Sequence, residues 1–395
     1  MLGGNNYMAI EEADRLKALP PYLFAEIDRI IQAKREKGED VISLGIGDPD
    51  IPTPDIIIES LCKGAKDSKN HRYPSSYGMN NFKNAVADFY KKRFNVVLDP
   101  ENEIITLWGS KEGIANIAYT FINPGDYSIV PDPGYLVYKI GTMFAGGIPY
   151  AAPLKEENKF LMDFSKIDTE IGKKAKLIYI NYPNNPTSAS CDVKFFEKSV
   201  EFANKFNLIV CHDNAYSDVY FDNANKPASF LNAGGAKELG IEFNSLSKTF
   251  NMTGWRIGYA VGNKDIISSL GKYKTNVDSG VFNAIQIAAI EAFKSYDDVF
   301  KSNLSIYKKR RNIIFNNLDQ IGISYYKSDA SIYIWAKVPE GYSSKSFAEL
   351  LLNKANVVVT PGSAFGDYGE GYFRISITLA DNRLEEALDR VKKVL

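Results

Sequence analysis

A regular alternation of strand and helix patterns is the feature of this sequence that most constrains its fold. Short apolar runs typical of buried strands occur at residues 104–107, 127–130, 176–180 and 208–211. Helical patterns lie between them, and parallel strands joined by crossover helices form a sheet with both faces covered. We therefore predict an α/β fold with a mostly parallel central sheet.

Polar residues with useful chemistry follow the predicted strands. They are Ser110, Asn185, Asp213, Ser245 and Lys248. Ligands of open α/β sheets bind beyond the carboxyl ends of the strands. The topology therefore predicts that these side chains meet at one site.

The stretch from Ser245 to Gly258 places Lys248 in a hydroxyl-rich turn between predicted strands at 242–246 and 257–261, with Arg256 eight residues after the lysine. A lysine amine can capture an aldehyde, and a guanidinium with hydroxyls can hold a phosphate. Gly109-Ser110 at a helix start also offers free N–H groups to a phosphate. Taken one at a time, these features have plainer explanations. Lys248 could be a solvated loop residue, and Gly109-Ser110 could be an ordinary helix cap. Together they favour a phosphate-bearing aldehyde cofactor.

Composition narrows the function further. The 395 residues are 45% hydrophobic, enough for one large and one smaller domain. The charges balance, at 47 basic and 48 acidic residues, which gives no indication of nucleic acid or an anionic membrane as partner. Three cysteines without CxxC spacing and two histidines do not suggest a disulfide framework or a metal centre. We expect a cytoplasmic protein, because neither a leader nor a membrane span is recognisable.

The rest of the chain predicts a smaller α/β unit. Glycine and proline between residues 45 and 54 indicate either a loop that approaches a ligand closely or a plain turn into the next helix. The run Lys308-Lys-Arg-Arg311 is expected to be the solvated face of a long helix. We predict a large domain at residues 49–285 and a small domain from residues 1–48 and 286–395.

These residues and their spacing resemble the class I and II aminotransferases, which are fold-type-I enzymes that use pyridoxal 5′-phosphate. The resemblance covers nearly the whole chain, and its motifs are Asn185-Pro-Thr, Asp213-x-x-Tyr216, Ser245-x-Ser-Lys248 with Arg256, and Phe373-Arg374-Ile-Ser376. Further stretches resemble the LL-diaminopimelate branch of that family. They are Tyr22-Leu-Phe-x-Glu-Ile, Leu44-Gly-Ile-Gly-Asp-Pro, Gly109-Ser-Lys-Glu-Gly, Asn181-Tyr-Pro-Asn-Asn-Pro-Thr and Asn276-Val-Asp-Ser-Gly.

The resemblance implies roles around the cofactor. Lys248 would bond to the cofactor aldehyde and later move the proton at the substrate Cα, while Asp213 would pair with the pyridine nitrogen. Asn185 and Tyr216 would donate to the 3′-oxygen, and Tyr135 would stack on the ring. The phosphate would be held by Ser110, Ser245 and Arg256, with Lys111 nearby. Ser247 could join them or serve only as a local turn hydroxyl.

The resemblance also implies substrate and subunit contacts. Arg374 would bind the substrate α-carboxylate in a bidentate way, although a buried structural salt bridge is the alternative that its residue type suggests. Tyr22, Gly47, Lys111 and Asn185 match substrate-contacting positions, but Tyr22 could instead pack against its own helix. Tyr73 and Asn276 match positions contributed by the neighbouring subunit of a homodimer, which would make each active site a composite.

One residue departs from the family pattern. Ser188 follows Asn-Pro-Thr, where glycine is usual. If φ is positive there, serine has a steric cost that glycine lacks. We expect catalysis to survive this change and the loop to shift slightly.

The activity that the resemblance implies is reversible amino transfer between LL-2,6-diaminopimelate and 2-oxoglutarate. In the reverse, lysine-biosynthetic direction, tetrahydrodipicolinate and glutamate would be the substrates. Alternatives are aminotransferases of alanine, aspartate, aromatic amino acids or acylated diaminopimelate, because any α-carboxylate suits Arg374. A serine acyl enzyme built on Ser245 and Lys248 would need S-D-N and K-T-G elements, and neither occurs. A binding protein that kept the fold is the non-enzyme alternative.

Overall fold

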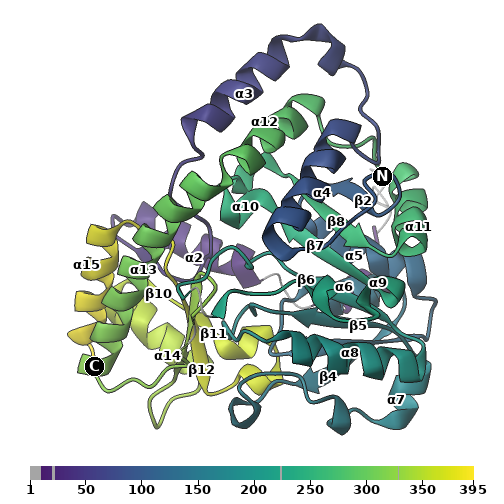
Figure 1. The fold of residues 1–395 in the computed structure, drawn as a ribbon. Coiled ribbons are helices and arrows are strands. Elements are labelled where there is room, and N and C mark those ends of the chain that lie inside the picture. The colour runs from purple at the N-terminus through teal and green to yellow at the C-terminus, as the bar shows by residue number, and fades with distance from the viewer. Residues whose placement is uncertain (1–9, 20–22, 223–224, 328) are drawn as a thin grey trace, which may run out of the picture.

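The computed structural model describes residues 10–19, 23–222, 225–327 and 329–395. Its centre is a seven-stranded sheet in the order β2-β8-β7-β6-β5-β3-β4 (Figure 1). The strands are β2 (Ile104–Leu107), β3 (Tyr127–Asp132), β4 (Ile148–Pro153), β5 (Ala175–Asn181), β6 (Ile209–Asp213), β7 (Gly240–Ser245) and β8 (Gly258–Gly262). Only β8 runs antiparallel to its neighbours, so the mostly parallel sheet is confirmed.

Alternate residues of the buried strands supply two separate cores. Ile178 and Val210 pack on one face, while Leu177 and Cys211 pack on the other. The first face is covered by α4 (Asn80–Phe94), α8 (Val193–Phe206), α9 (Ala236–Leu239) and α12 (Asn283–Lys294). The second face is covered by α5 (Ser110–Phe121), α6 (Val137–Phe144) and α11 (Lys264–Thr275). The sheet is therefore enclosed on both sides, as predicted.

The edge strand β4 was not predicted. It contains Pro149 and Pro153, and most of its side chains are partly or fully exposed. Prolines and incomplete burial remove the apolar run that identifies a central strand, yet both are tolerated at a sheet edge.

A second unit holds two small sheets. Strand β1 (Ile42–Ser43) pairs with β10 (Val357–Val358), and β12 (Tyr372–Ser376) lies between β11 (Thr360–Pro361) and β9 (Tyr333–Lys337). The helices of this unit are α2 (Leu23–Glu36), α13 (Tyr296–Gln320), α14 (Ser344–Leu350) and α15 (Asp381–Lys392).

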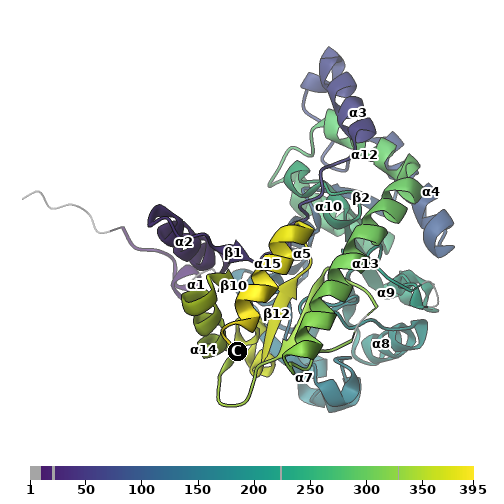
Figure 2. The same cartoon turned by 90° about the vertical axis from the view of Figure 1, so that its left-hand side faces the viewer.

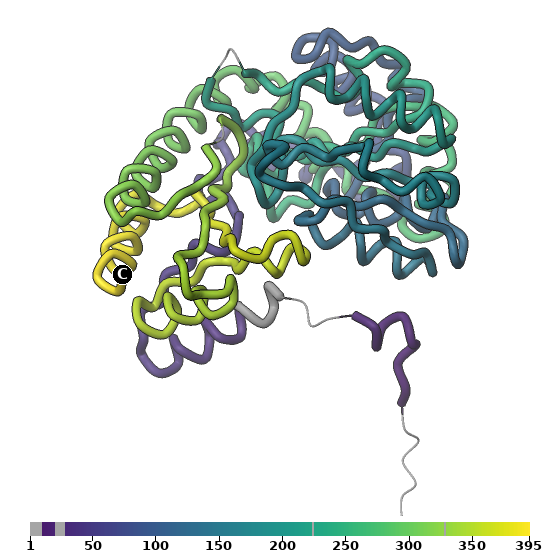
Figure 3. Tube along the Cα trace, turned by 90° about the horizontal axis from the view of Figure 1, so that it is seen from below, coloured from purple at the N-terminus to yellow at the C-terminus, as the bar shows by residue number. Residues whose placement is uncertain are grey.

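Both ends of the chain contribute to this second unit. Helices α13 and α15 lie side by side (Figure 2), and α2 lies against the yellow-green C-terminal segments (Figure 3), where its Ile31 packs with Leu352 and Val358. The domain boundaries at residues 48 and 285 stay predictions. Helix α12 lies along α3 (Asp55–Lys66) beside the large sheet (Figure 1).

The basic run on α13 is solvated only in part: Lys308 and Lys309 are exposed, as predicted, but the prediction is wrong for Arg310 and Arg311. Arg310 is buried and binds both carboxylate oxygens of Asp50, at 2.6 and 2.9 Å, and Asp381 at 2.9 Å. Arg311 lies 4.3 Å above the ring of Phe221. Two sides of α13 therefore face protein. Among the described residues, no helix is long and apolar enough to cross a bilayer.

Candidate active site

A cavity of about 420 Å³ lies at the carboxyl ends of β5, β6 and β7, and residues from the second unit close its other side. Eleven of the predicted site residues line it. They are Gly47, Ser110, Lys111, Tyr135, Asn185, Asp213, Tyr216, Ser245, Lys248, Arg256 and Arg374. The prediction that these side chains meet is thus correct for the described residues, and Tyr22 lies outside them.

Lys248 lies on the one-turn helix α10 (Leu246–Thr249), directly after β7. The Ser245 hydroxyl caps this turn by accepting a hydrogen bond from the Ser247 N–H at 3.2 Å. The Lys248 amine donates to the Gly47 carbonyl oxygen at 2.7 Å. Burial lowers the pKa of Lys248, and the nearby charges of Arg374 and Arg256 act in the same direction. A larger share of neutral amine makes a better nucleophile and base.

Asp213 is the last residue of β6, and its buried carboxylate faces the cavity. One oxygen, Oδ2, accepts a hydrogen bond from the Tyr138 hydroxyl at 2.8 Å. The other, Oδ1, is buried without a hydrogen-bond partner among the described residues. Burial raises the pKa of Asp213 to about 6, against the lowering effects of Tyr138 and His212. A protonated ring nitrogen is the donor that this oxygen would accept from.

The start of α5 and the Arg256 guanidinium form the other end of the cavity. Gly109 precedes α5 with a φ of 83°, and a Cβ there would lie 2.7 Å from Arg256 Nη2. The guanidinium is held by the Thr253 carbonyl at 2.8 Å and the Trp108 carbonyl at 3.3 Å. Free N–H groups, the helix dipole and a fixed guanidinium together suit a phosphate.

Arg374 is buried at the cavity wall on β12. Its Nη1 donates to the Asn185 side-chain oxygen at 2.7 Å, and its Nη2 donates to the Gly45 carbonyl at 2.6 Å. The guanidinium also lies 4.0 Å from the centre of the Tyr333 ring. Two hydrogen bonds and a ring contact therefore fix the orientation of this side chain.

Tyr333 lines the cavity and was missed by the sequence analysis. Its hydroxyl lies 3.2 Å from that of Tyr216, and a Cβ on Gly47 would lie 2.1 Å from the same oxygen. Close approach to Tyr333 is thus the reason for glycine at position 47. Tyr333 lies on β9, and a single tyrosine within an apolar strand looks like a core residue. Tyr138 was missed for a similar reason, because it lies one helical turn after Tyr135.

Two predicted residues lie away from the cavity. Tyr73 is 90% exposed and lines a separate surface hollow with Trp108 and Phe282. Asn276 is exposed at the end of α11, and its side chain donates to the Lys272 carbonyl at 2.7 Å. Their predicted contribution to a partner's site stays a prediction.

The predicted strain at Ser188 is present. Its φ is 62°, and the side chain is fully buried. The hydroxyl donates to the Tyr333 carbonyl oxygen at 2.6 Å. Serine thus gains a bond between the loop after β5 and the strand β9 that glycine would lack.

A doubly covered α/β sheet with a half-buried lysine, an unpartnered aspartate oxygen and a phosphate cradle around one cavity defines a pyridoxal-phosphate-dependent transferase. The match of residues 39–391 to the model of the family "Aminotransferase class I and II" is in agreement. The chain belongs to that family.

Known proteins match almost the full chain. It is 54% identical over 384 residues to an LL-diaminopimelate aminotransferase of Aquifex aeolicus, covering 97% of this chain and 99% of the relative. A protein of the same name from Moorella thermoacetica is 51% identical over 386 residues, with 98% and 99% covered. Substrate-bound BacF from Bacillus subtilis superposes with a TM-score of 0.93 at 39% identity, and 98% of each chain is covered.

Proposed function

We propose that this protein catalyses reversible amino transfer between LL-2,6-diaminopimelate and 2-oxoglutarate, with pyridoxal 5′-phosphate as cofactor. The relatives of that name, which match over nearly their whole length, support the choice of substrate. The observation that carries the chemistry is the cavity itself, because it brings Lys248, Asp213 and Arg374 together.

Each residue has a definable task in this reaction. When bound, pyridoxal phosphate supplies an electron sink for the bond that breaks at the substrate Cα. Lys248 would take the proton from the substrate Cα and deliver it to C4′ of the cofactor, and its amine has the lowered pKa that a base at neutral pH needs. Asp213 holds a proton on the ring nitrogen with its unpartnered oxygen. Arg256, Ser110 and Ser245 hold the phosphate.

Arg374 binds the α-carboxylate of either substrate. A guanidinium presents two parallel N–H donors to a carboxylate, which fixes the orientation of the neighbouring Cα–H bond. Asn185 shares a hydrogen bond with Arg374 and lines the same cavity, so it contacts both the cofactor and the substrate side. Lys111 and Gly47 complete the substrate side.

The functional unit in this proposal is a homodimer in the cytoplasm. Tyr73 and Trp108, which line the separate surface hollow, expose 90% and 39% of their surface. Exposed apolar side chains around one hollow are typical of a surface that binds a partner. Tyr73 and Asn276 would then reach the partner's cavity rather than their own.

An amino-donor panel with 2-oxoglutarate tests the substrate. The holoenzyme should turn over LL-diaminopimelate faster than alanine, aspartate, aromatic amino acids or acylated diaminopimelate. Robust turnover of one of these with none of LL-diaminopimelate would overturn the substrate assignment. A protein that stays colourless after reconstitution with pyridoxal phosphate would overturn the reaction class. A serine acyl enzyme or a binding protein would then be the remaining alternatives.

Lys248→Ala provides the mechanistic control. This variant should keep the cofactor, because the phosphate cradle and Asp213 are unchanged, but it should not perform multiple turnovers. Sustained turnover by Lys248→Ala would contradict the assignment of Lys248 as the base.

A further inference from the structure

A fully buried pair of titratable side chains lies behind the cavity, and the mechanism above does not use it. His212 on β6 and Glu242 on β7 are both inaccessible to solvent, and 2.8 Å separates His212 Nδ1 from Glu242 Oε2. His212 directly precedes Asp213 on β6, and successive side chains of a strand point to opposite faces of the sheet. The His212–Glu242 pair therefore lies on the face behind Asp213, whose side chain faces the cavity.

The Glu242 carboxylate accepts hydrogen bonds from several further donors. They are the Tyr90 hydroxyl at 2.6 Å, the Asn214 amide at 3.0 Å, the Ser229 hydroxyl at 2.9 and 3.0 Å, and the Phe230 N–H at 2.7 Å. Burial on its own would raise the pKa of Glu242, but the hydrogen bond and charge of His212 and the other donors hold it below its ordinary value. Glu242 is thus a buried, ionised carboxylate, and an imidazolium at His212 would balance its charge.

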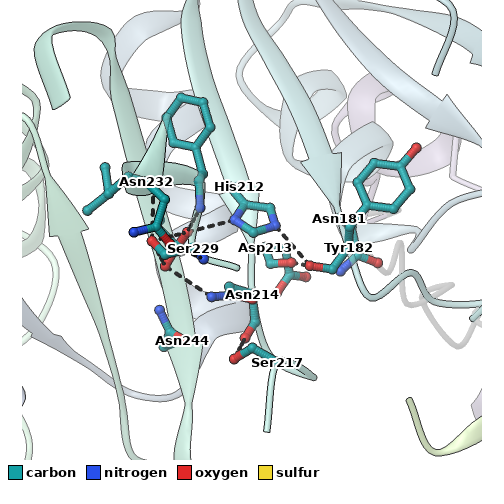
Figure 4. A network of polar contacts seen from close by, with 12 residues as sticks. Asn181, Tyr182, His212, Asp213, Asn214, Ser217, Ser229, Asn232 and Asn244 are labelled. Carbon is teal, nitrogen blue, oxygen red and sulfur yellow. Dashed lines mark hydrogen bonds and ion pairs between the residues drawn. The ribbon is translucent and has the colours of Figure 1, made fainter. Parts of the chain in front are cut away.

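The second ring nitrogen of His212 also faces an acceptor. Nε2 lies 3.1 Å from the carbonyl oxygen of Tyr182. Figure 4 shows the ring between Tyr182 on one side and Ser229 with Asn232 on the other. A carbonyl oxygen and an ionised carboxylate both accept hydrogen bonds and have no proton to donate. With acceptors at both nitrogens, the ring satisfies its surroundings only when each nitrogen carries a proton.

We propose that His212 is a charged positioning residue, whose imidazolium is balanced by Glu242 and keeps the neighbouring Asp213 in its carboxylate form. The ring also fixes the chain after β5 through the Tyr182 carbonyl. That chain carries Asn185, whose N–H donates to the Asn181 side chain at 2.7 Å, and Asn181 in turn donates to the Asp213 carbonyl at 2.8 Å. One buried charge thus supports both Asp213 and Asn185.

The surroundings of the ring favour a fixed protonation state. Phe196 from α8 and Phe230 pack on it, with ring centres 4.9 and 6.4 Å away. The titratable groups that interact electrostatically with His212 or Glu242 are Asp213, the next residue of β6, Tyr90 from α4, Tyr259 from β8 and the Cys191 thiol, whose pKa burial raises. Among these neighbours the Asp213 carboxylate carries a negative charge, and together with Glu242 it favours the imidazolium.

Nitrogen NMR on ¹⁵N-histidine-labelled protein measures this protonation state directly. The chain has only two histidines, and His71→Gln assigns the signals by removing that of the exposed His71. We expect both nitrogens of His212 to show the imidazolium signature at neutral pH, because each of them faces an acceptor. An unprotonated ring nitrogen on His212 would mean that Glu242 holds the proton, and this result would overturn the proposal. The wild-type protein suffices for this measurement, with or without cofactor.

Two variants test the effect of the His212 charge on Asp213. This test rests on the proposed function, because its readout is the rate of amino transfer. His212→Gln keeps a donor but removes the charge, so the pKa of Asp213 should rise and the acid limb of the kcat–pH profile should move upward by about one pH unit. At neutral pH we expect kcat to fall about tenfold with KM within about twofold. Cys211→Ala changes the preceding, equally buried residue of β6 and should leave the profile in place.

The two experiments separate the two proposals. An unmoved acid limb in His212→Gln would refute the support of Asp213 by His212. If the holoenzyme shows no amino transfer at all, the proposed function fails, while the NMR signals of His212 still decide its charge.

Discussion

The Ser188 hydroxyl donates a hydrogen bond to the Tyr333 carbonyl oxygen at 2.6 Å, from a backbone with a φ of 62°. The bond joins the loop that carries Asn185 to the strand that carries Tyr333, and both of these residues line the cavity. A strained serine thus connects the large sheet to the smaller one. Its hydrogen bond and its backbone strain act on stability in opposite directions.

Two substitutions separate these effects. Ser188→Ala loses the bond and keeps the left-handed strain, so unfolding should require about 1–3 kcal/mol less than in the wild type. Ser188→Gly loses the same bond but relieves about 1–2 kcal/mol of strain, part of which glycine's greater freedom in the unfolded chain cancels. Denaturant unfolding should therefore rank wild type, glycine and alanine in decreasing stability. A glycine variant less stable than the alanine variant would contradict this balance.

Asp213→Asn should change the pH dependence of stability in the cofactor-free protein. The pKa of Asp213 rises from 3.8 to about 6 on folding, so the folded state binds this proton more tightly than the unfolded state does. Its contribution to stability is therefore full below pH 3.8 and is lost as the pH rises through about 6.

The asparagine variant does not titrate. Relative to wild type, its stability should increase by on the order of 3 kcal/mol between about pH 4 and 7, while activity is lost. Thermal unfolding across this pH range checks the difference, and parallel stability curves for the two proteins would contradict it.

Arg374→Lys should weaken both substrates of the reaction. A lysine ammonium lacks the planar pair of donors that a carboxylate binds, and it cannot reproduce the contacts to Asn185 and Gly45 at once. We expect KM for the amino donor and for 2-oxoglutarate to rise by about tenfold or more. Steady-state kinetics with each substrate varied in turn tests this, and an effect on only one substrate would argue against a shared carboxylate site.

Gly47→Ala should disrupt the cavity through Tyr333. The new methyl group would lie 2.1 Å from the hydroxyl and 2.4–2.5 Å from two ring carbons of Tyr333. Loss of the hydroxyl in Tyr333→Phe leaves the ring overlap, so only a smaller residue, as in Tyr333→Leu, should restore cofactor binding to Gly47→Ala. The double variants can be compared by cofactor retention on gel filtration. If Tyr333→Phe restored cofactor binding to Gly47→Ala, the ring of residue 333 would move away from the new methyl group, which would contradict the predicted overlap.

The sequence predicted the central sheet well because its strands are buried on both faces, which produces continuous apolar runs between helical patterns. Strand β4 gave no such signal, since an edge position allows proline and exposure. Arg310 was misread because charge alone does not reveal that Asp50 and Asp381, distant in sequence, approach the same helix.

The site was predictable where side chains follow strand ends, as Asp213 and Ser245 do. Tyr333 and Tyr138 were missed because their role depends on what their hydroxyls reach, and sequence spacing does not contain that information. The His212–Glu242 pair was equally hidden. A histidine next to a functional aspartate shows its importance only when both ring nitrogens can be followed to their acceptors.

Two carbonyls of the short loop after β1 accept hydrogen bonds from the two cationic side chains of the cavity. Lys248 donates to the Gly47 carbonyl, and Arg374 donates to the Gly45 carbonyl, two residues earlier. The backbone of this loop therefore fixes the amine and the guanidinium relative to each other, so that a shift of the loop would displace the partners of both.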